Sequence, residues 1–292
     1  MPSTREMRLR IRSVKNISQV TRALETVSAS KVRKAMQATL ATQAYADQAW
    51  KVLMHLASQP GSHTLHPLLN ERETVSKILV VMISGDRGLA GAYNVNVLRN
   101  TLEHAQVFKQ PVSYVTVGRK GRDLLLRRRR NIIAEFSNLT SPATYLETAA
   151  IGKLLVDDFL SEGYDQVYLS YTEFVNMMVQ RPVFRKLLPL ELPEDEQVKI
   201  SGSRSVFTYE PDQGELLNQI IPRFTALKVY QAILSSQASE HAARMVAMRN
   251  ATENGQELIH LLQLDYNKAR QQIITNEMLD IVGGANALSD AG

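Results

Sequence analysis

The chain has 292 residues, enough to bury a sizeable core, and 44% are hydrophobic, 22% charged and only 6% aromatic. It has no cysteine, which excludes disulfides, thiolate metal ligands and a cysteine nucleophile. No stretch approaches the roughly 18 apolar residues that cross a bilayer, and the N-terminus lacks the apolar core of a secretory signal. We therefore expect a helix-rich cytoplasmic protein.

Basic residues are concentrated at the start of the chain. Residues 1–40 hold nine basic and two acidic side chains, a net charge of +7, whereas the whole chain carries +5. A basic amphipathic segment can bind nucleic acid, acidic lipid or an acidic protein surface, and salt would weaken each of these contacts.

Residues 4–57 contain neither glycine nor proline, and their apolar or small residues recur three or four positions apart. These positions are Met7, Ile11, Val14, Ile17, Thr21, Leu24, Ser28, Ala35, Ala38, Thr42 and Tyr45. The spacing predicts one helix, ~80 Å long at the helical rise per residue. Pro60 and Gly61 are expected to follow its end.

The central residues alternate between short apolar runs and helical patterns. We predict strands over 78–83, 112–117, 166–171 and 185–192, and helices over 94–110, 119–130 and 145–161. Strands separated by helices predict a parallel sheet with crossover helices, as in a Rossmann-like domain. The acidic stretch 191–196 is expected to be an exposed loop.

Helical periodicity returns over residues 213–287. Heptad positions a and d, which run from Leu217 and Ile220 to Ile273 and Asn276, are mostly apolar or small, so we predict a left-handed coiled coil. Pro222 is expected to kink the first turns or to lie near the helix start, and Gly255 to allow close helix approach. The pair Gly283 and Gly284 is expected to stop the helix.

Two helices of this length exceed what a small domain can cover, since helices in globular proteins average 11–12 residues. We therefore predict an α/β fold with long helices, in which an antiparallel coiled coil of the N- and C-terminal helices flanks a small Rossmann-like α/β domain. The predicted parts are a coiled-coil helix over 1–58, the α/β domain over 74–210 and a coiled-coil helix over 211–287. The predicted seam includes Val14, Leu24, Met245, Met248, Ile259, Leu262, Tyr266 and Ile273.

Several blocks of sequence resemble, in the correct order, the gamma subunits of rotary F-type ATP synthases. They are residues 11–34, 84–94, 117–121, 239–254 (SEHAARMVAMRNATEN), 266–277 and 281–285. Residues 24–27 (LETV) differ from the Met-Glu-Met-Val run usual in that family, and residues 186–210 match it poorly. The thiol regulation of chloroplast members is excluded because the chain has no cysteine.

The resemblance implies a central rotor shaft that couples ion flow through the membrane to ATP synthesis or hydrolysis on other subunits. Its implied partners are three alpha and three beta subunits around the rod, and the epsilon subunit and c-subunit ring at its foot. It implies no active site and no cofactor in the chain itself, no nucleic-acid partner and no direct membrane insertion. The expected location is the cytoplasmic face of a bacterial plasma membrane.

Two groups of residues are candidate contacts with the beta subunits. Arg270, Gln271 and Thr275 match positions where the rod of the family contacts a beta-subunit loop, although a solvated face explains them equally well. The second group, which would face acidic levers on the beta subunits, is Lys31, Arg33, Lys34, Arg8, Arg10 and Arg12. Exposed ion pairs of roughly 0–1 kcal/mol would suit a contact that must be released.

Other motifs favour structural interpretations. Gly85, Gly88 and Gly91 have neither the dinucleotide-binding spacing nor that of a P-loop, and Gly118–Gly121 is more typical of a basic strand-to-helix turn than of a phosphate site. The run Arg127–Arg130 is interpreted as a solvated face in preference to a site for acidic proteins, nucleic acid or lipid headgroups. No metal site is predicted, and the histidines singled out as structural are His63, His66 and His241.

Two other functions remain as alternatives. A nucleic-acid-binding coiled coil is suggested by the basic first helix, but residues 1–44 contain no aromatic side chain for base stacking. A small α/β nucleotide enzyme with helical arms is disfavoured by the glycine spacing.

Overall fold

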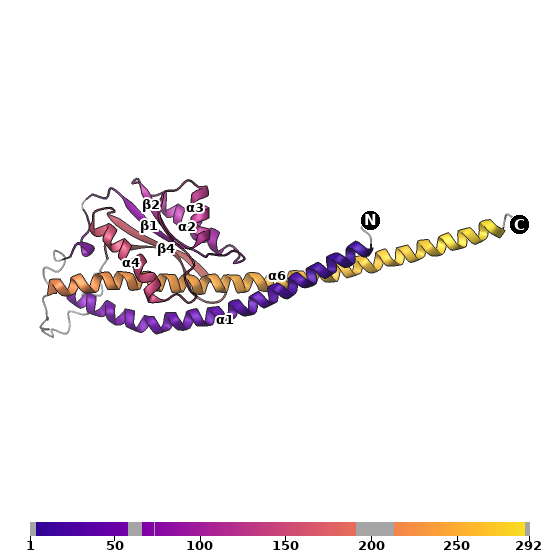
Figure 1. Ribbon diagram of the computed structural model, residues 1–292, viewed down its shortest axis with the longest axis horizontal. Coiled ribbons are helices and arrows are strands. Elements are labelled where there is room, and N and C mark those ends of the chain that lie inside the picture. Colours follow the sequence, from indigo (N-terminus) through magenta and orange to yellow (C-terminus); the bar gives the residue numbers. More distant parts are fainter. Residues whose placement is uncertain (1–3, 58–65, 73, 191–212, 290–292) are drawn as a thin grey trace. The chain divides into compact units, whose positions relative to one another are not determined.

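The computed structural model describes residues 4–57, 66–72, 74–190 and 213–289, and Figure 1 shows the chain as a ribbon. Two long helices, α1 (Thr4–Ala57) and α6 (Gln213–Ser289), bracket the sheet in the sequence. The chain divides into two compact units, residues 28–244 and residues 1–27 with 245–292, and both helices contribute to both units. The division into three parts predicted above stays a prediction.

The larger unit contains a five-stranded sheet in the order β3-β2-β1-β4-β5. Its strands are β1 (Ile78–Ile83), β2 (Val112–Val117), β3 (Ile132–Phe136), β4 (Gln166–Phe174) and β5 (Gln180–Leu188). The first four are parallel, as predicted, whereas β5 is antiparallel to β4, so the sheet is mixed. A tight hairpin joins β4 to β5, and only an antiparallel strand can follow so short a connection.

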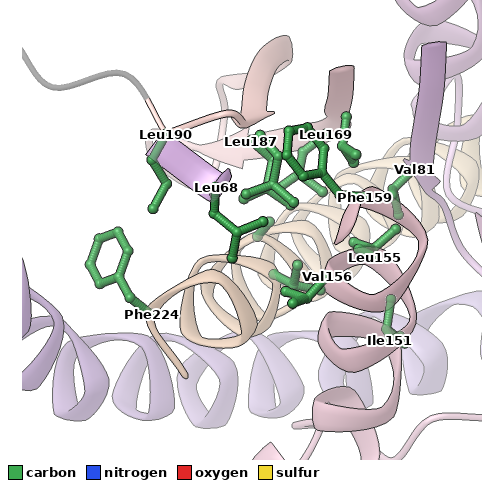
Figure 2. Packing of buried hydrophobic residues seen from close by; sticks show 14 of the residues in the cluster. Leu68, Val81, Ile151, Leu155, Val156, Phe159, Leu169, Leu187, Leu190 and Phe224 are labelled. Carbon is green, nitrogen blue, oxygen red and sulfur yellow. The ribbon is translucent and has the colours of Figure 1, made fainter. Parts of the chain in front are cut away.

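The two faces of the sheet are buried by different helices. Alternate residues of β1 point to opposite faces, and α2 (Tyr93–Ala105) and α3 (Arg119–Arg127) pack with Val80 and its neighbours on one of them. On the other face α4 (Tyr145–Leu160) and α6 pack with Val81 and its neighbours. Figure 2 shows side chains of α4 and of the strands converging in this second cluster, with Phe224 of α6 at its margin.

A capping box fixes the start of α4. The Thr144 hydroxyl accepts a hydrogen bond from the Glu147 amide, and the Glu147 carboxylate accepts one from the Thr144 amide at 2.8 Å. The Thr140 hydroxyl also donates to Glu147 at 2.6 Å. These hydrogen bonds, that from Thr140 first, hold the pKa of Glu147 at about 2, below its ordinary value of 4.5.

We expect Glu147→Ala to lower the free energy of unfolding by about 1 kcal/mol at neutral pH, because the capping box is lost at an exposed helix start. Since the folded-state pKa is depressed, this contribution is present above pH 4.5 and disappears as the pH falls toward about 2. Urea unfolding of parent and variant at both ends of this range measures it. A difference that stays constant across the range would contradict the assignment.

The helices α1 and α6 run antiparallel within each unit. In the larger unit Trp50 stacks on Phe224 with ring centroids 5.2 Å apart, and Ala46 packs with Leu227, Tyr230 and Leu234. In the smaller unit the Thr21 and Thr252 hydroxyls are 2.7 Å apart, and earlier residues of α1 meet later residues of α6. The predicted antiparallel pairing is therefore confirmed, unit by unit.

Several local expectations differ from the structure. In α1 the predicted positions Ile17 and Tyr45 are exposed, and their neighbours Ser18 and Ala46 are buried in their place. Pro222 lies inside α6. The helix also continues through Gly283, since glycine lowers helix propensity by about 1 kcal/mol without removing a backbone hydrogen bond.

Candidate functional site

In the smaller unit the first part of α1 packs against the last part of α6, and we call the contact between them the seam. Along α6 a row of buried or half-buried residues follows heptad spacing: Met245, Met248, Thr252, Gly255, Ile259, Leu262, Tyr266 and Ala269. Along α1 the matching residues are Met7, Ile11, Val14, Ser18, Thr21 and Leu24. This spacing is typical of a coiled coil, and the predicted seam residues from Val14 to Tyr266 are buried or half-buried.

Small residues let the two helices approach closely at the middle of this seam. A methyl group added to Gly255 would lie 3.4 Å from the Cβ of Ser18, so the space between the helices here admits only small side chains. The Thr252 hydroxyl donates to the Met248 carbonyl. The Thr21 hydroxyl can donate either to the Ser18 carbonyl or to the Thr252 oxygen, so both hydroxyls have partners inside the seam.

The last contact of the seam joins Arg8 of α1 to Tyr266 of α6. The Arg8 guanidinium lies over the Tyr266 ring, 5.1 Å from its centroid, and its Nε donates to the Tyr266 hydroxyl at 2.8 Å. Beyond Ala269, every described side chain from Arg270 to Val282 is exposed, including the apolar residues Ile273, Ile274, Met278, Leu279, Ile281 and Val282. Ile273, a predicted seam residue, is 44% exposed, because Arg8 at the start of α1 already lies against Tyr266.

The predicted beta-contact residues are all exposed. Arg270, Gln271 and Thr275 lie on the last part of α6, where the Thr275 hydroxyl donates to the Gln271 carbonyl at 2.9 Å. On α1 the exposed residues are Arg8, Arg10, Arg12, Lys31, Arg33 and Lys34. Arg10 is paired with Glu6 at 2.8 Å, one turn earlier on the same helix. The structure therefore leaves both groups accessible to another chain.

The first glycine turn serves the structure of the α/β part. The Asp86 carboxylate accepts hydrogen bonds from the amides of Arg119 and Asn138, and the Gly85 amide donates to the Asn94 side chain at 2.9 Å. A Cβ on Gly85 would lie 2.8 Å from the carboxylate of Glu240. The Gly85 amide and the Asp86 carboxylate are thus used within the α/β part, and the turn packs against α6.

The second glycine turn packs against the first. Gly118 has φ +100°, and a Cβ there would lie 2.3 Å from the Ser84 carbonyl, so only glycine fits. The Gly121 amide donates to the Ser84 hydroxyl at 2.9 Å. This contact consumes an amide that a phosphate would need, which favours the structural interpretation of both turns.

An ion pair whose two side chains are 12% and 13% exposed fastens α6 to the first turn. The Arg244 guanidinium donates to Glu240 Oε1 at 2.5 Å and to the Gly88 carbonyl at 3.1 Å. Burial raises the pKa of Glu240, and the charge of Arg244 opposes this shift. Sequence reasoning missed this pair, although Glu240 and Arg244 are spaced by one helical turn within the family-like block 239–254.

His241 belongs to the same cluster and is hydrogen-bonded, as predicted. Arg244 donates to its Nδ1 at 3.2 Å, which leaves the proton on Nε2 to be donated to the Ser141 hydroxyl at 2.7 Å. Burial, followed by the charges of Arg244 and Lys31, lowers the pKa of His241 to about 4. His66 is also structural, since its Nδ1 accepts from the Leu68 amide at the start of η2 (Pro67–Leu69).

We expect His241→Gln to flatten the acid dependence of stability. The folded protein keeps His241 neutral down to about pH 4, whereas the unfolded chain takes up a proton near pH 6.5, so the parent loses stability as the pH falls between these values. The slope from one such group reaches about 1.4 kcal/mol per pH unit. Denaturant unfolding across this window measures it, with the exposed His260→Gln as control, and equal slopes in parent and variant would refute the prediction.

The described part of the chain contains no cluster of three acidic or histidine side chains that could hold a metal ion. His63 lies outside the described residues. Among the described helices, none has a segment long and apolar enough to cross a membrane.

Comparison with known proteins identifies the family. The model of the ATP synthase family matches residues 3–288. The ATP synthase gamma chains of Dehalococcoides mccartyi and Roseiflexus castenholzii are 47% and 44% identical to this chain, each over 99% of it and 100% of the relative.

Solved structures agree. A chain of the central stalk and c-ring of Tetrahymena thermophila mitochondrial ATP synthase is 25% identical, covers 80% of this chain and 99% of its own length, and has a TM-score of 0.61. A chain of the Euglena gracilis mitochondrial enzyme shares the fold with a TM-score of 0.67, at 20% identity over 98% of this chain and 94% of its own. The chain therefore belongs to the ATP synthase gamma-chain family, whose members form the central stalk of the rotary enzyme.

Proposed function

We propose that this chain is the rotating shaft of an F-type ATP synthase and has no active site of its own. The observation that carries the proposal is its likeness to ATP synthase gamma chains along their whole length, at 47% identity. The described polar clusters support it, because the glycine turns and the Glu240–Arg244 pair use their hydrogen-bonding groups within the fold.

For the shaft to control catalysis, it need only contact the three catalytic subunits differently at any one moment. A shaft without symmetry, inside a ring of three alpha and three beta subunits, contacts three identical catalytic subunits differently. Such contact is a coupling free energy, and rotation of the shaft changes which site it favours. The exposed Arg270, Gln271 and Thr275 and the exposed cations Arg10, Arg12, Lys31, Arg33 and Lys34 are the proposed contacts with the beta subunits.

These contacts must form and break in each turn. Exposed ion pairs contribute roughly 0–1 kcal/mol each, which is weak enough for release. Arg8 is held by Tyr266, so we assign it to stiffening the seam more than to binding a beta subunit. The epsilon subunit and the c-subunit ring are the proposed partners at the foot, with no nucleic acid and no cofactor. The proposed location is the cytoplasmic face of a bacterial plasma membrane, bound through these subunits.

The test is reconstitution of the catalytic particle. Alpha and beta subunits from the same genome would be expressed with and without this chain, purified, and assayed for steady hydrolysis of Mg-ATP. We expect a three-to-three-to-one particle whose hydrolysis depends on this chain, and no protection of the isolated chain against heat by ATP. Failure of the chain to associate with these subunits would overturn the proposal.

A further inference from the structure

A row of cations lies at the end of the sheet in the larger unit where its parallel strands begin. The parallel strands β1, β2 and β3 begin side by side, since Ile78 pairs with Val112 and the Tyr114 amide donates to the Asn131 carbonyl. Lys77 immediately precedes β1, Lys109 lies just before β2, and Arg127–Arg130 lead into β3. Neighbouring strands are about 5 Å apart, so the three strand starts lie within ~10 Å. We name Lys77, Lys109 and Arg127–Arg130 the basic edge.

The basic edge is exposed and not neutralised. All six side chains are exposed, and no ion pair joins any of them to a carboxylate in the described residues. The nearby acids are engaged elsewhere: Arg122 binds Asp123 and Glu135, and Arg72 binds Asp165. The charge of this edge is therefore available to a partner.

Arg129 has a backbone conformation that disfavours arginine. Its φ is +53°, and its amide donates to the Leu126 carbonyl in the turn that ends α3. This left-handed position after a helix is most often occupied by glycine, because a side chain is strained there. An arginine at such a position adds charge to the edge at the expense of local stability.

Aliphatic side chains flank the cations. Val107 is 79% exposed and lies two residues before Lys109, and Leu126 is 55% exposed and immediately precedes the arginine run. Cations mixed with exposed aliphatic residues are typical of surfaces that rest on a lipid headgroup layer, where the cations bind phosphates and the aliphatic groups enter the interface. Binding of nucleic acid, which is dominated by contacts of cations with phosphates, would not depend on these aliphatic residues.

The basic edge also lies at a particular end of the larger unit. The Leu190 amide donates to the Leu68 carbonyl beside the starts of β1 and β4, and both leucines pack in the same cluster as Leu53 near the end of α1 and Leu217 near the start of α6. Arg244 lies at the opposite end of this unit, since it contacts Gly88 beyond the carboxyl end of β1. The basic edge thus lies at the end of the larger unit where the parallel strands begin.

We propose that the basic edge binds the anionic phospholipid headgroups of a membrane surface. The inference rests on the proposed function only for the presence of a membrane nearby. Its test uses the full chain alone, so lipid binding can fail while assembly with alpha and beta subunits succeeds, and the reverse.

The test is flotation of the full chain with vesicles of phosphatidylcholine and with vesicles that also contain phosphatidylglycerol, at low ionic strength. We expect binding to the anionic vesicles alone, reversed by salt. The variant Arg128→Gln, Arg129→Gly, Arg130→Gln should bind on the order of 100-fold more weakly. It should melt no lower than the parent, because glycine removes the strain at position 129. The control Lys51→Gln, Arg99→Gln, Lys153→Gln removes the same charge elsewhere in the larger unit and should bind nearly as well as the parent.

A second variant separates lipid from other polyanions. Val107→Ser with Leu126→Ser should weaken binding to anionic vesicles and leave binding to duplex DNA unchanged. Equal losses in the arginine variant and its control would overturn the proposal, because net charge would then explain the binding. So would binding that the serine variant does not weaken, which would identify a general polyanion surface.

Discussion

Proline in place of Met248 should uncouple ATP hydrolysis from proton pumping in the assembled enzyme. Met248 is 5% exposed in the seam, and its carbonyl accepts the hydrogen bond of the Thr252 hydroxyl. A proline inside a helix removes a backbone hydrogen bond and clashes with the preceding turn, at a cost of about 3 kcal/mol or more. A shaft bent or loosened at this point would no longer transmit torque between its ends.

The measurement is ATP-driven acidification of inverted membrane vesicles, compared with hydrolysis in the same preparation. Met248→Leu keeps the volume and the helix, so it should pump normally, and Arg249→Ala changes only an exposed neighbour. An enzyme with Met248→Pro that assembles and pumps as the parent does would contradict the role of the seam.

Replacing Arg244 with methionine should destabilise the larger unit by about 3–5 kcal/mol at neutral pH, because the carboxylate of Glu240 would then be buried without its partner. The same change removes the hydrogen bonds that join α6 to the Gly88 carbonyl. Adding Glu240→Gln should restore much of the stability, since it removes the charge that had lost its partner.

The pH dependence of this variant has a predicted sign. Burial already raises the pKa of Glu240, and loss of the Arg244 charge raises it further. Protonation removes the unpaired charge, so the Arg244→Met variant should regain stability relative to the parent as the pH falls below neutrality. Denaturant unfolding at neutral and mildly acidic pH tests this. A variant as stable as the parent, or one that Glu240→Gln does not rescue, would show that the pair does not fasten α6.

The sequence predicted the long helices and the buried strands because their periodicity is local. The first helix was placed at 4–57 and found at Thr4–Ala57, and the strand at 78–83 was found unchanged. The strand β3 was missed because Ile132–Phe136 lies at the sheet edge, where its residues are only partly buried and directly follow an arginine run. The strand β5 was predicted over 185–192 but begins at Gln180, which pairs with Phe174 of β4 across the hairpin, a contact that periodicity does not show.

For the candidate site, too, the sequence predicted what depends on local spacing and missed what depends on contacts between distant residues. Seam residues follow from heptad spacing, as Met248 and Leu262 illustrate. The cluster of Glu240, His241 and Arg244 joins α6 to loops about 100 or more residues away in the chain, at Ser141 and Gly88. Only the fold brings these groups together, so their spacing on one helix gave no sign of their partners.

Rotation of this chain inside its catalytic ring is the most direct measurement. Because the chain has no cysteine, Glu103→Cys on the exposed side of α2 gives a single labelling site for a bead, with the alpha and beta subunits fixed to a surface. On addition of Mg-ATP, the rotor assignment predicts stepwise rotation of the bead in one direction, and a stop when ATP is removed. A particle that hydrolyses ATP steadily while the labelled chain stays fixed would contradict it.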